Sequence, residues 1–480
     1  MVEIELKFQI SEARRTALLK ALDPKKSETI QLQAKYFDTP DRLLAQDGAA
    51  LRQRLEGACW IQTLKAAGKS HLHRFEHNHN LGELESSPEL DLSIYQAIPE
   101  AQQILTQALG SDAAALKLTF ETDIQRTYRV IQFEDAEIEV CLDVGVVRAS
   151  GREQTIHEVE FELKSGSVQS LLAFSFEWVK KYQLWLDVRS KAEMGNLLAL
   201  EQTVSPARFE KEFVLSKKES AAHNLSLLIG QQMQHLLPNI AAISAGVAEQ
   251  SHIDQAQTAL EHLQLTLALF KDWNSNISDK WAMQLAAFKH QFDHLQHLQH
   301  MQSTLGAFLQ NPTTTENLAK DILYAQEKLG NLVKSTQNVH HYLELLTFSL
   351  SSHDQVQKQD LKTYAHNTLQ NQYRQLQESL NAADISHFES LDVLAQKIKE
   401  LKFSFPILTS IYDVKNLQKY SKALNDAQQA AHEYQILATS AAYIQQTELE
   451  ASDWFVLGWL TAKLEEIGRA SCRERVSTFV

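Results

Sequence analysis

The chain has 480 residues, of which 22% are charged and 44% hydrophobic, and this composition describes an ordinary globular protein with two or more domains. The net charge of -14 argues against non-specific binding to nucleic acid, and no apolar run of about twenty residues indicates a membrane span. The three cysteines (Cys59, Cys141 and Cys472) are scattered, and the first residues lack the pattern of a secretory signal, so we expect a cytoplasmic protein.

Residues 1–10 alternate between apolar and charged side chains, which is the pattern of a strand with one face in a core. The charged face carries Glu3, Glu5 and Lys7. Two carboxylates on one surface repel each other unless a cation lies between them. An edge strand protected by its charges explains this segment equally well, so the rest of the chain has to decide.

Further strand patterns follow along the first two hundred residues, at 31–38, 50–55, 60–65, 72–78, 118–130, 137–144 and 157–164. Helical patterns lie between them, at 11–22, 89–109 and 168–182. Acidic side chains share faces on the first strand and near residues 140 and 160, whereas basic side chains share faces near residues 52, 65, 74 and 126. Because solvated strands would mix both signs, this segregation predicts one cavity inside a closed barrel.

The charges of such a cavity indicate its chemistry. A barrel interior rich in Arg and Lys must hold an anion, because buried unpaired charge is very costly. An interior rich in Asp and Glu must hold metal cations, and hard oxygen ligands favour Mg²⁺ or Mn²⁺ over zinc. Metal ions and many cations around a polyanion are typical of phosphoryl transfer.

These segments resemble the CYTH domain, also called the triphosphate tunnel metalloenzyme fold, over roughly residues 1–200. The resemblance is carried by an ordered set of motifs, namely Glu3-x-Glu5-x-Lys7, Tyr36-Phe37-Asp38-Thr39, Leu51-Arg52-x-Arg54, Thr63-Leu64-Lys65, Arg74-x-Glu76, Asp143-x-Gly145 and Glu158-x-Glu160-x-Glu162-Leu163. It implies an eight-stranded antiparallel barrel that forms a tunnel, a linear triphosphate substrate and catalysis by a divalent metal.

The resemblance also implies roles for individual residues. The metal ligands would be Glu3, Glu5, Glu160 and Glu162, with Asp143 helping. The phosphates would be held by Lys7, Arg52, Arg54, Lys65, Arg74, Arg126 and Lys191. Lys65 would lie nearest the leaving oxygen and act in catalysis together with Glu5 and Glu162. Glu158 shares the acidic face and would be a supporting residue.

The second half of the chain differs from the first in composition and in the spacing of its apolar residues. Residues 201–213, around Ser205-Pro206, are predicted to be a linker. Residues 214–466 have few glycines and prolines and show long helical patterns, at 259–273, 277–309, 314–350 and 355–380. Composition alone predicts an all-α bundle without chemistry of its own. The order of the two halves resembles the CYTH–CHAD pairing of bacteria, whose helical domain is built from two four-helix halves and is thought to meet polyphosphate.

The helical half departs from the CHAD pattern at its basic positions. Residues 254–270 keep the apolar frame of the signature helix, at Leu260, Leu263, Leu267 and Phe270. Its basic positions are replaced by Asp254, Gln257, Glu261, His262 and Gln264. In the second half, Lys399 and Lys402 remain, whereas Asp392 and Ala395 replace His and Arg. Phosphate contacts need cations, so we expect the fold to be kept and most of the polyphosphate surface to be lost.

Two further segments carry predictions. His290, His294, His297 and His300 follow one helical stripe, for which we predict a solvated face rather than a metal site. Residues 467–480 break the helical texture and are suddenly basic. They resemble translated sequencing-adaptor DNA, so we predict a non-native tail and exclude it from the fold. A genuine basic tail is the alternative, which resequencing of the locus through its stop codon would test.

The sequence therefore predicts an α+β protein, with an eight-stranded antiparallel barrel over residues 1–200 and an all-α bundle over residues 214–466. The leading hypothesis is a metal-dependent inorganic triphosphatase that forms pyrophosphate and phosphate. A class IV adenylate cyclase or a thiamine triphosphatase would use the same barrel but would need a pocket for a base or a thiazolium. A non-catalytic polyphosphate-binding protein would not need the paired carboxylates.

Overall fold

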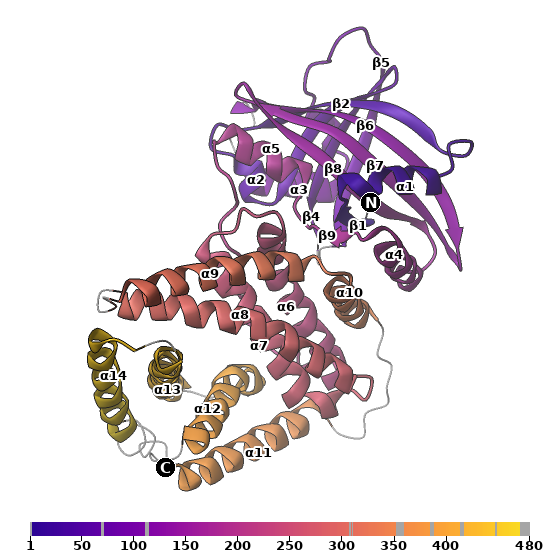
Figure 1. The fold of residues 1–480 in the computed structure, drawn as a ribbon. Helices are drawn as coiled ribbons and strands as arrows, with labels where there is room; N and C mark the ends of the chain where they lie inside the picture. The colour runs from indigo at the N-terminus through magenta and orange to yellow at the C-terminus, as the bar shows by residue number, and fades with distance from the viewer. Residues whose placement is uncertain are drawn as a thin grey trace. The chain divides into compact units, whose positions relative to one another are not determined.

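The computed structural model describes residues 2–68, 72–110, 115–306, 309, 311–351, 360–384, 388–412, 417–446 and 449–470. The chain divides into two compact units, which Figure 1 traces from the indigo N-terminus to the yellow C-terminus. The first unit comprises Met1–Phe209, Met233–Gln255 and Val333–Ser351. The second comprises Glu210–Gln232, Ala256–Leu332 and Ser352–Val480.

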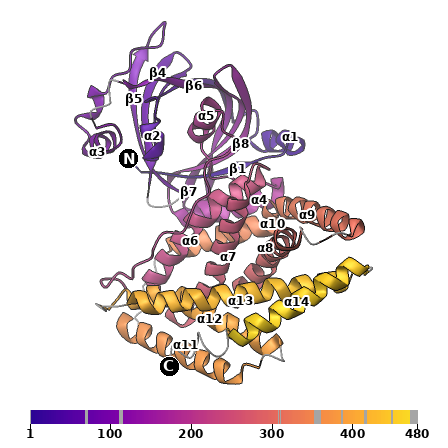
Figure 2. The same cartoon turned by 90° about the vertical axis from the view of Figure 1, so that its left-hand side faces the viewer.

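Eight strands of the first unit form a closed antiparallel barrel, which Figure 2 shows as a ring. They are β1 (Val2–Gln9), β2 (Glu28–Asp38), β3 (Ala49–Glu56), β4 (Cys59–Ala67), β5 (His73–Glu83), β6 (Lys117–Phe133), β7 (Ala136–Ala149) and β8 (Arg152–Ser165). Their order around the ring is β5-β4-β3-β2-β6-β7-β8-β1, and a short pairing of β1 with β5 closes it. The two-residue strand β9 (Trp185–Leu186) also pairs with β1. The predicted eight-stranded antiparallel barrel is therefore confirmed.

The alternating pattern of β1 and β8 separates an apolar outer face from a charged inner one. On the outside, the Phe8 ring lies 5.1 Å from the Phe161 ring, and Phe161 lies 5.2 Å from Phe174 of helix α4 (Val168–Tyr182). Phe8 and Phe161 are fully buried there. Because successive side chains of a strand point to opposite faces, this outer core directs the neighbouring acidic residues into the barrel.

The other helices of the first unit are α1 (Glu12–Ala21), α2 (Leu43–Gln46), η1 (Ser93–Tyr95), α3 (Pro99–Leu109), α5 (Lys191–Ala199) and α10 (Thr336–Leu350). The Asp38 carboxylate accepts hydrogen bonds from the backbone N–H groups of Thr39, Leu44 and Ala45, at 2.8, 3.0 and 3.0 Å. Asp38 of the predicted motif is thus a structural residue that fixes the turn into α2. Helix α5 reaches the barrel interior, where Met194 packs in one cluster with Tyr36, Phe120 and Ile124.

The remaining elements are helical. They are α6 (Ala221–Ser244), α7 (Gln250–Leu269), η3 (Lys271–Trp273), α8 (Asp279–Leu305), α9 (Pro312–Val333), α11 (Leu361–Ala382), α12 (Phe388–Thr409), α13 (Leu417–Gln445) and α14 (Ala451–Ala470). Within the described ranges, none of the helices combines the length and the apolar character that crossing a membrane requires. Cys472 and most of the predicted non-native tail lie outside the described residues, and the first part of that tail continues α14.

One predicted helical segment is wrong in its extent. The pattern at 314–350 predicted a single helix, whereas α9 ends at Val333 and α10 begins at Thr336. Ser335 makes the break, because its side chain caps α10 by accepting a hydrogen bond from the Asn338 N–H at 3.3 Å. The two helices also belong to different units, α10 to the barrel unit and nearly all of α9 to the other.

Candidate functional site

Three neighbouring strands supply the acidic wall of the barrel. The register of β7 against β8 sets Asp143 opposite Glu158 and Glu139 opposite Glu162. The register of β8 against β1 sets Glu162 opposite Glu5. Carboxylates from β1, β7 and β8 therefore form one continuous surface, as the alternating pattern predicted.

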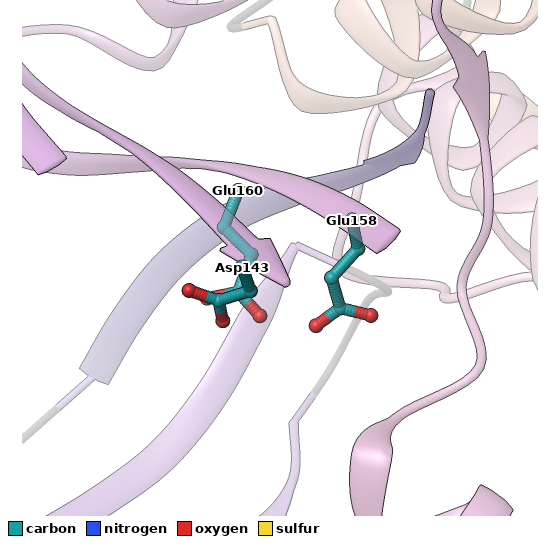
Figure 3. A group of neighbouring side chains, drawn as sticks. All are labelled: Asp143, Glu158 and Glu160. Atoms are coloured by element: carbon teal, nitrogen blue, oxygen red, sulfur yellow. The ribbon is translucent and has the colours of Figure 1, made fainter. Parts of the chain in front are cut away.

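Within this wall, Asp143, Glu158 and Glu160 converge. Each offers one carboxylate oxygen, and these three oxygens lie within 4.8 Å of one another. Figure 3 shows Asp143 and Glu160 side by side, with Glu158 beside them on the same strand as Glu160. Asp143 and Glu158 are fully buried, and Glu158 Oε2 has no hydrogen-bond partner among the residues that the structure describes. A set of oxygen donors with one oxygen unsatisfied fits a hard divalent cation.

Two cationic side chains hold this cluster of carboxylates together. Lys191 Nζ lies 2.7 Å from Asp143 Oδ2 and 2.9 Å from Glu160 Oε1, and it also contacts Glu158. Arg126 donates two hydrogen bonds of 2.7 Å to the Asp143 carboxylate and one to Glu160. Such bidentate, charge-assisted pairs are among the strongest polar contacts in proteins.

Burial and ion pairing shift the pKa values of Glu158 and Glu160 in opposite directions. Burial raises the pKa of Glu158 to about 7, although Lys191 and Lys7 act against it. Burial also acts to raise the pKa of Glu160, but Lys191 and Arg126 outweigh it and hold that pKa well below its usual range. The cluster therefore combines a carboxylate that readily stays protonated with one that stays ionised.

A second group of charges lies where β1 meets β5 and β4. Lys65 Nζ lies 2.8 Å from Glu3 Oε2 and 2.9 Å from Glu76 Oε2. Arg74 Nη1 lies 3.1 Å from Glu5 Oε1. Burial raises the pKa of Glu3 to about 8, against the attraction of Lys65. Both β1 carboxylates are thus held by side chains that were predicted to bind phosphate.

The two predicted arginines of β3 differ in their partners. Arg52 Nη1 lies 3.4 Å from the Tyr36 hydroxyl, and Arg52 Nη2 lies 3.9 Å from Glu76 Oε1. Arg52 Nε is buried without a hydrogen-bond partner among the described residues. Arg54 pairs with Glu56, and burial together with Arg52 lowers the pKa of Arg54 to about 10. Of the two arginines, Arg52 is the one whose positive charge has only a distant carboxylate partner.

Of the five predicted metal ligands, Asp143 and Glu160 belong to the cluster of converging carboxylates, whereas Glu3, Glu5 and Glu162 do not. Glu162 pairs with Lys164 at 2.9 Å, and Lys164 also lies 3.3 Å from Glu139. Glu162 is not part of the cluster of Asp143, Glu158 and Glu160. Glu158 was predicted to be a supporting residue. Tyr36 and Glu76 belong to the motifs of the resemblance but were given no role, and Lys164 was not predicted at all. The β7–β8 register, which alternation alone does not specify, is the signal that would have identified Glu158.

A small pocket adjoins the β1 side of the barrel within the first unit. Its polar side is Glu5, Lys7 and Arg74. Its apolar side is Leu6, Leu72, Leu186, Val188, Leu237 and Leu346, of which the last two belong to α6 and α10. The pocket lies near the seam where β5 pairs with β1 only from Val2 to Ile4. Helical segments far along the chain therefore cover this part of the barrel wall.

In the second unit, carboxylates neutralise lysines close to the signature helix of the resemblance. Lys399 Nζ lies 2.7 Å from Glu261 Oε1, and Lys289 Nζ lies 3.6 Å from the same oxygen. Lys289 also pairs with Asp293 at 2.7 Å. An anionic ligand would have to displace these carboxylates before it could use either lysine.

Comparison with known proteins identifies both halves of the chain. The CYTH domain model matches residues 1–196, and the CHAD domain model matches residues 227–445. The inorganic triphosphatase of Haemophilus influenzae is 33% identical over 227 residues, which are 46% of this chain and 62% of that protein. The chain thus spans about three fifths of the length of this curated relative.

Two solved structures are similar to parts of the chain. The CHAD domain from the plant Ricinus communis is 14% identical, with a TM-score of 0.47, and covers 56% of this chain and 96% of its own. A Hippeastrum protein described as an adenylyl cyclase with a dominant triphosphatase activity is 17% identical, with a TM-score of 0.31, and covers 42% of this chain and 97% of its own.

Proposed function

Because the chain belongs to the CYTH-domain proteins in which a CHAD domain follows the barrel, we propose that it is a metal-dependent inorganic triphosphatase. The observation that carries the proposal is the cluster of Asp143, Glu158 and Glu160 in a closed barrel whose β3 wall bears Arg52 and Arg54. Carboxylates for a cation and guanidinium groups for a polyanion suit a metal–triphosphate substrate. The name of the Haemophilus influenzae relative supports the same activity.

The proposed reaction transfers the terminal phosphoryl group of triphosphate to water. The water oxygen forms a bond to the terminal phosphorus, the water gives up one proton, and the bridging P–O bond breaks with its electrons staying on pyrophosphate. Arg52, Arg54 and Lys7 would hold the phosphate oxygens, and Lys65 would stabilise the charge on the leaving oxygen. A divalent ion on the carboxylates would offset phosphate charge and lower the pKa of the attacking water.

The donor set supports Mg²⁺ or Mn²⁺ as the ion. Asp143, Glu158 and Glu160 present only carboxylate oxygens, which these hard cations prefer, and no sulfur or imidazole group belongs to the cluster. Glu3 and Glu5 would complete the ligand set from β1, and Glu162 would join it only after releasing Lys164. We expect the enzyme to act in the cytoplasm, where these cations and phosphate compounds meet.

The test is phosphate release by the purified protein with Mg²⁺ or Mn²⁺ on four substrates: tripolyphosphate, ATP, thiamine triphosphate and long-chain polyphosphate. We expect turnover of tripolyphosphate far above the others, and loss of that turnover when the metal is chelated. Preference for ATP with formation of cyclic AMP would favour a cyclase, and preference for thiamine triphosphate would favour that hydrolase. Absence of turnover by a folded barrel would contradict the proposal.

A pair of variants separates an enzyme from a polyphosphate-binding protein. Glu5→Gln should abolish metal-dependent turnover while leaving an anion site that binds as well as before or better. Glu153→Gln is the matched control, because Glu153 also pairs with an arginine but is half-exposed on the barrel. Full turnover in Glu5→Gln would show that this β1 carboxylate has no part in the reaction.

A further inference from the structure

The charges of the barrel pair across their proposed roles. Side chains proposed to hold phosphate bind the carboxylates proposed to hold metal. The pairs are Lys65 with Glu3, Arg74 with Glu5, Arg126 with Asp143 and Glu160, and Lys191 with Asp143 and Glu160. The proposed binding groups of the tunnel therefore neutralise one another.

This pairing gives either ligand alone a poor site. A metal ion bound to Glu3 and Glu5 would take Arg74 from its carboxylate and leave Lys65 with Glu76, in a wall where the two cationic side chains are only 22% and 23% exposed. Triphosphate bound to the same cations would leave two carboxylates, 9% and 8% exposed, facing an anion. Each case removes ion-pair partners from charges that are largely shielded from water, which is strongly unfavourable.

The two ligands together remove this penalty. The cations then turn from carboxylate to phosphate, and the carboxylates turn from ammonium and guanidinium groups to the metal ion. No buried charge is left without a partner. Arg52, whose carboxylate partner Glu76 lies 3.9 Å away, adds positive charge for the polyanion.

We infer that metal ion and triphosphate bind this barrel cooperatively, by an exchange of ion-pair partners in which Glu3–Lys65 and Glu5–Arg74 are the pairs that open. The inference rests on the proposed function and adds to it that the barrel takes up metal and triphosphate as a pair and discriminates against either one alone. Thermodynamic linkage makes the effect reciprocal, so each ligand must raise the affinity of the other by the same factor.

The first experiment uses the wild-type full chain and imidotriphosphate, whose P–N–P bridges resist hydrolysis. Calorimetric titration with this analogue is carried out in chelator and in saturating Mg²⁺. Titration with Mg²⁺ is carried out with and without the analogue, after correction for Mg²⁺–analogue binding in solution. We expect the affinity of each ligand to rise by about 5- to 150-fold in the presence of the other. Equal affinities in both arms would overturn the inference.

A second experiment breaks one pair. Glu3→Gln removes one of the two carboxylates that pair with Lys65, so the metal-free analogue should bind more tightly than it binds the wild type, and the coupling factor should shrink. Glu5→Gln should act in the same way through Arg74, which protects the test against a folding defect in one variant. Glu153→Gln, half-exposed and paired with Arg148, should change neither quantity. If the metal served only to screen phosphate charge, Glu3→Gln would leave metal-free binding unchanged, which would contradict partner exchange.

The outcomes distinguish this inference from the proposed function. An analogue that fails to bind even in saturating Mg²⁺, together with absence of tripolyphosphate turnover, would reject the triphosphatase. Normal turnover of tripolyphosphate, together with an analogue affinity that is indifferent to metal, would reject only the cooperative exchange.

Discussion

At Glu158, burial and charge conflict. Its side chain is fully buried, one of its oxygens contacts Lys191, and the other has no hydrogen-bond partner among the described residues. Native proteins rarely leave a buried carboxylate oxygen unsatisfied without a functional reason. A bound cation would satisfy that oxygen and would also favour the ionised form of a group whose pKa burial raises to about 7.

We therefore expect Glu158→Gln to impair the use of metal more than the binding of phosphate. The amide keeps the shape of the side chain but removes its charge. The Mg²⁺ concentration for half-maximal turnover should rise about 10- to 100-fold, the usual effect of disturbing the groups around a metal site. Titration of activity with Mg²⁺ measures this, with Glu153→Gln on the same strand as control. An unchanged Mg²⁺ requirement would place Glu158 outside the metal site.

The sequence predicts which face of a strand a side chain lies on, but not which residue of the neighbouring strand it meets. Period two on β8 correctly predicts that Glu158, Glu160 and Glu162 share a face. It does not predict which of them meets Asp143, because that depends on a register set by the whole β6–β7–β8 ladder. A shift of the β7–β8 register by two residues would keep every side chain on its face and would bring Glu160 opposite Asp143.

At the scale of elements, helix α5 brings Lys191 to the carboxylates. Ser190 caps the helix by accepting a hydrogen bond from the Glu193 N–H at 3.0 Å. Gly195 allows the close approach, because a Cβ atom there would lie 2.1 Å from the Phe120 ring. Phe120 cannot easily yield, since it is buried and stacked on Tyr36 at 4.4 Å.

Gly195→Ala should therefore destabilise the barrel and lower turnover by displacing Lys191. Alanine gains about 1 kcal/mol of helix propensity, but overpacking a rigid core costs about 1–3 kcal/mol, so the clash should win. The control is Gly330→Ala in α9, where an added Cβ meets nothing within 4 Å and propensity alone should stabilise. Thermal denaturation and tripolyphosphate turnover report both effects. Equal behaviour of the two variants would refute the role of the close approach.

The ion pair between Glu261 of α7 and Lys399 of α12 leads to a second prediction. Glu261 neutralises Lys399 and Lys289, so the wild-type helical unit should bind polyphosphate weakly. Glu261→Gln should free Lys399, while Lys289 keeps Asp293, and should produce measurable, salt-sensitive polyphosphate binding. Filter binding of labelled polyphosphate at two salt concentrations measures it. Glu378→Gln, which removes an exposed partner of Arg374, is the control. Tight binding by the wild type would show that Glu261 does not block the site.

Most strands and helices could be predicted, because the apolar residues of each element repeat with the period of a strand or of a helix. Strands β2 to β8 and helix α4 lie where alternation and helical spacing placed them. The break between α9 and α10 was missed because the apolar spacing continues through it and only the cap at Ser335 reveals it. The membership of α10 in the barrel unit was unpredictable, since it depends on contacts with α4 such as the hydrogen bond from His340 Nε2 to Phe176 O at 3.1 Å.

At the scale of the whole molecule, histidines link stability to pH. His290 and His294 are exposed as the stripe predicted, but His297 and His300 are half-buried, and the His300 ring lies 5.5 Å from that of His432 on α13. Burial lowers the pKa of His297 and of His432. The other charged or titratable groups that influence the pKa of His297 or His432 are Asp293, Lys289, His294, His300, Lys399 and Glu261.

The helical unit should therefore lose stability in mild acid. Above pH 6.5 these histidines are neutral in both states and their contribution is fully present. As the pH falls below 6.5 the unfolded chain takes up protons first, so the free energy of unfolding decreases through the lower folded pKa. Urea denaturation at pH 7.5 and pH 5.5 measures this loss. His297→Gln should reduce the pH dependence, and exposed His290→Gln should not. An identical dependence in both variants would assign it elsewhere.

The inclusion of α10 in the barrel unit has a consequence for the biosynthesis of the protein. The ribosome completes β1 to β9 and α4 long before it adds Val333–Ser351. At the usual rate of ~5–20 residues per second, the interval is on the order of ten seconds. During that time the α4 surface around Phe176 is not covered by α10. The apolar side of the pocket, to which Leu237 and Leu346 contribute, is also incomplete. The nascent barrel thus exposes apolar surface that is buried in the complete protein. The yield of folded protein would then depend on a chaperone or on rapid folding of the helical half.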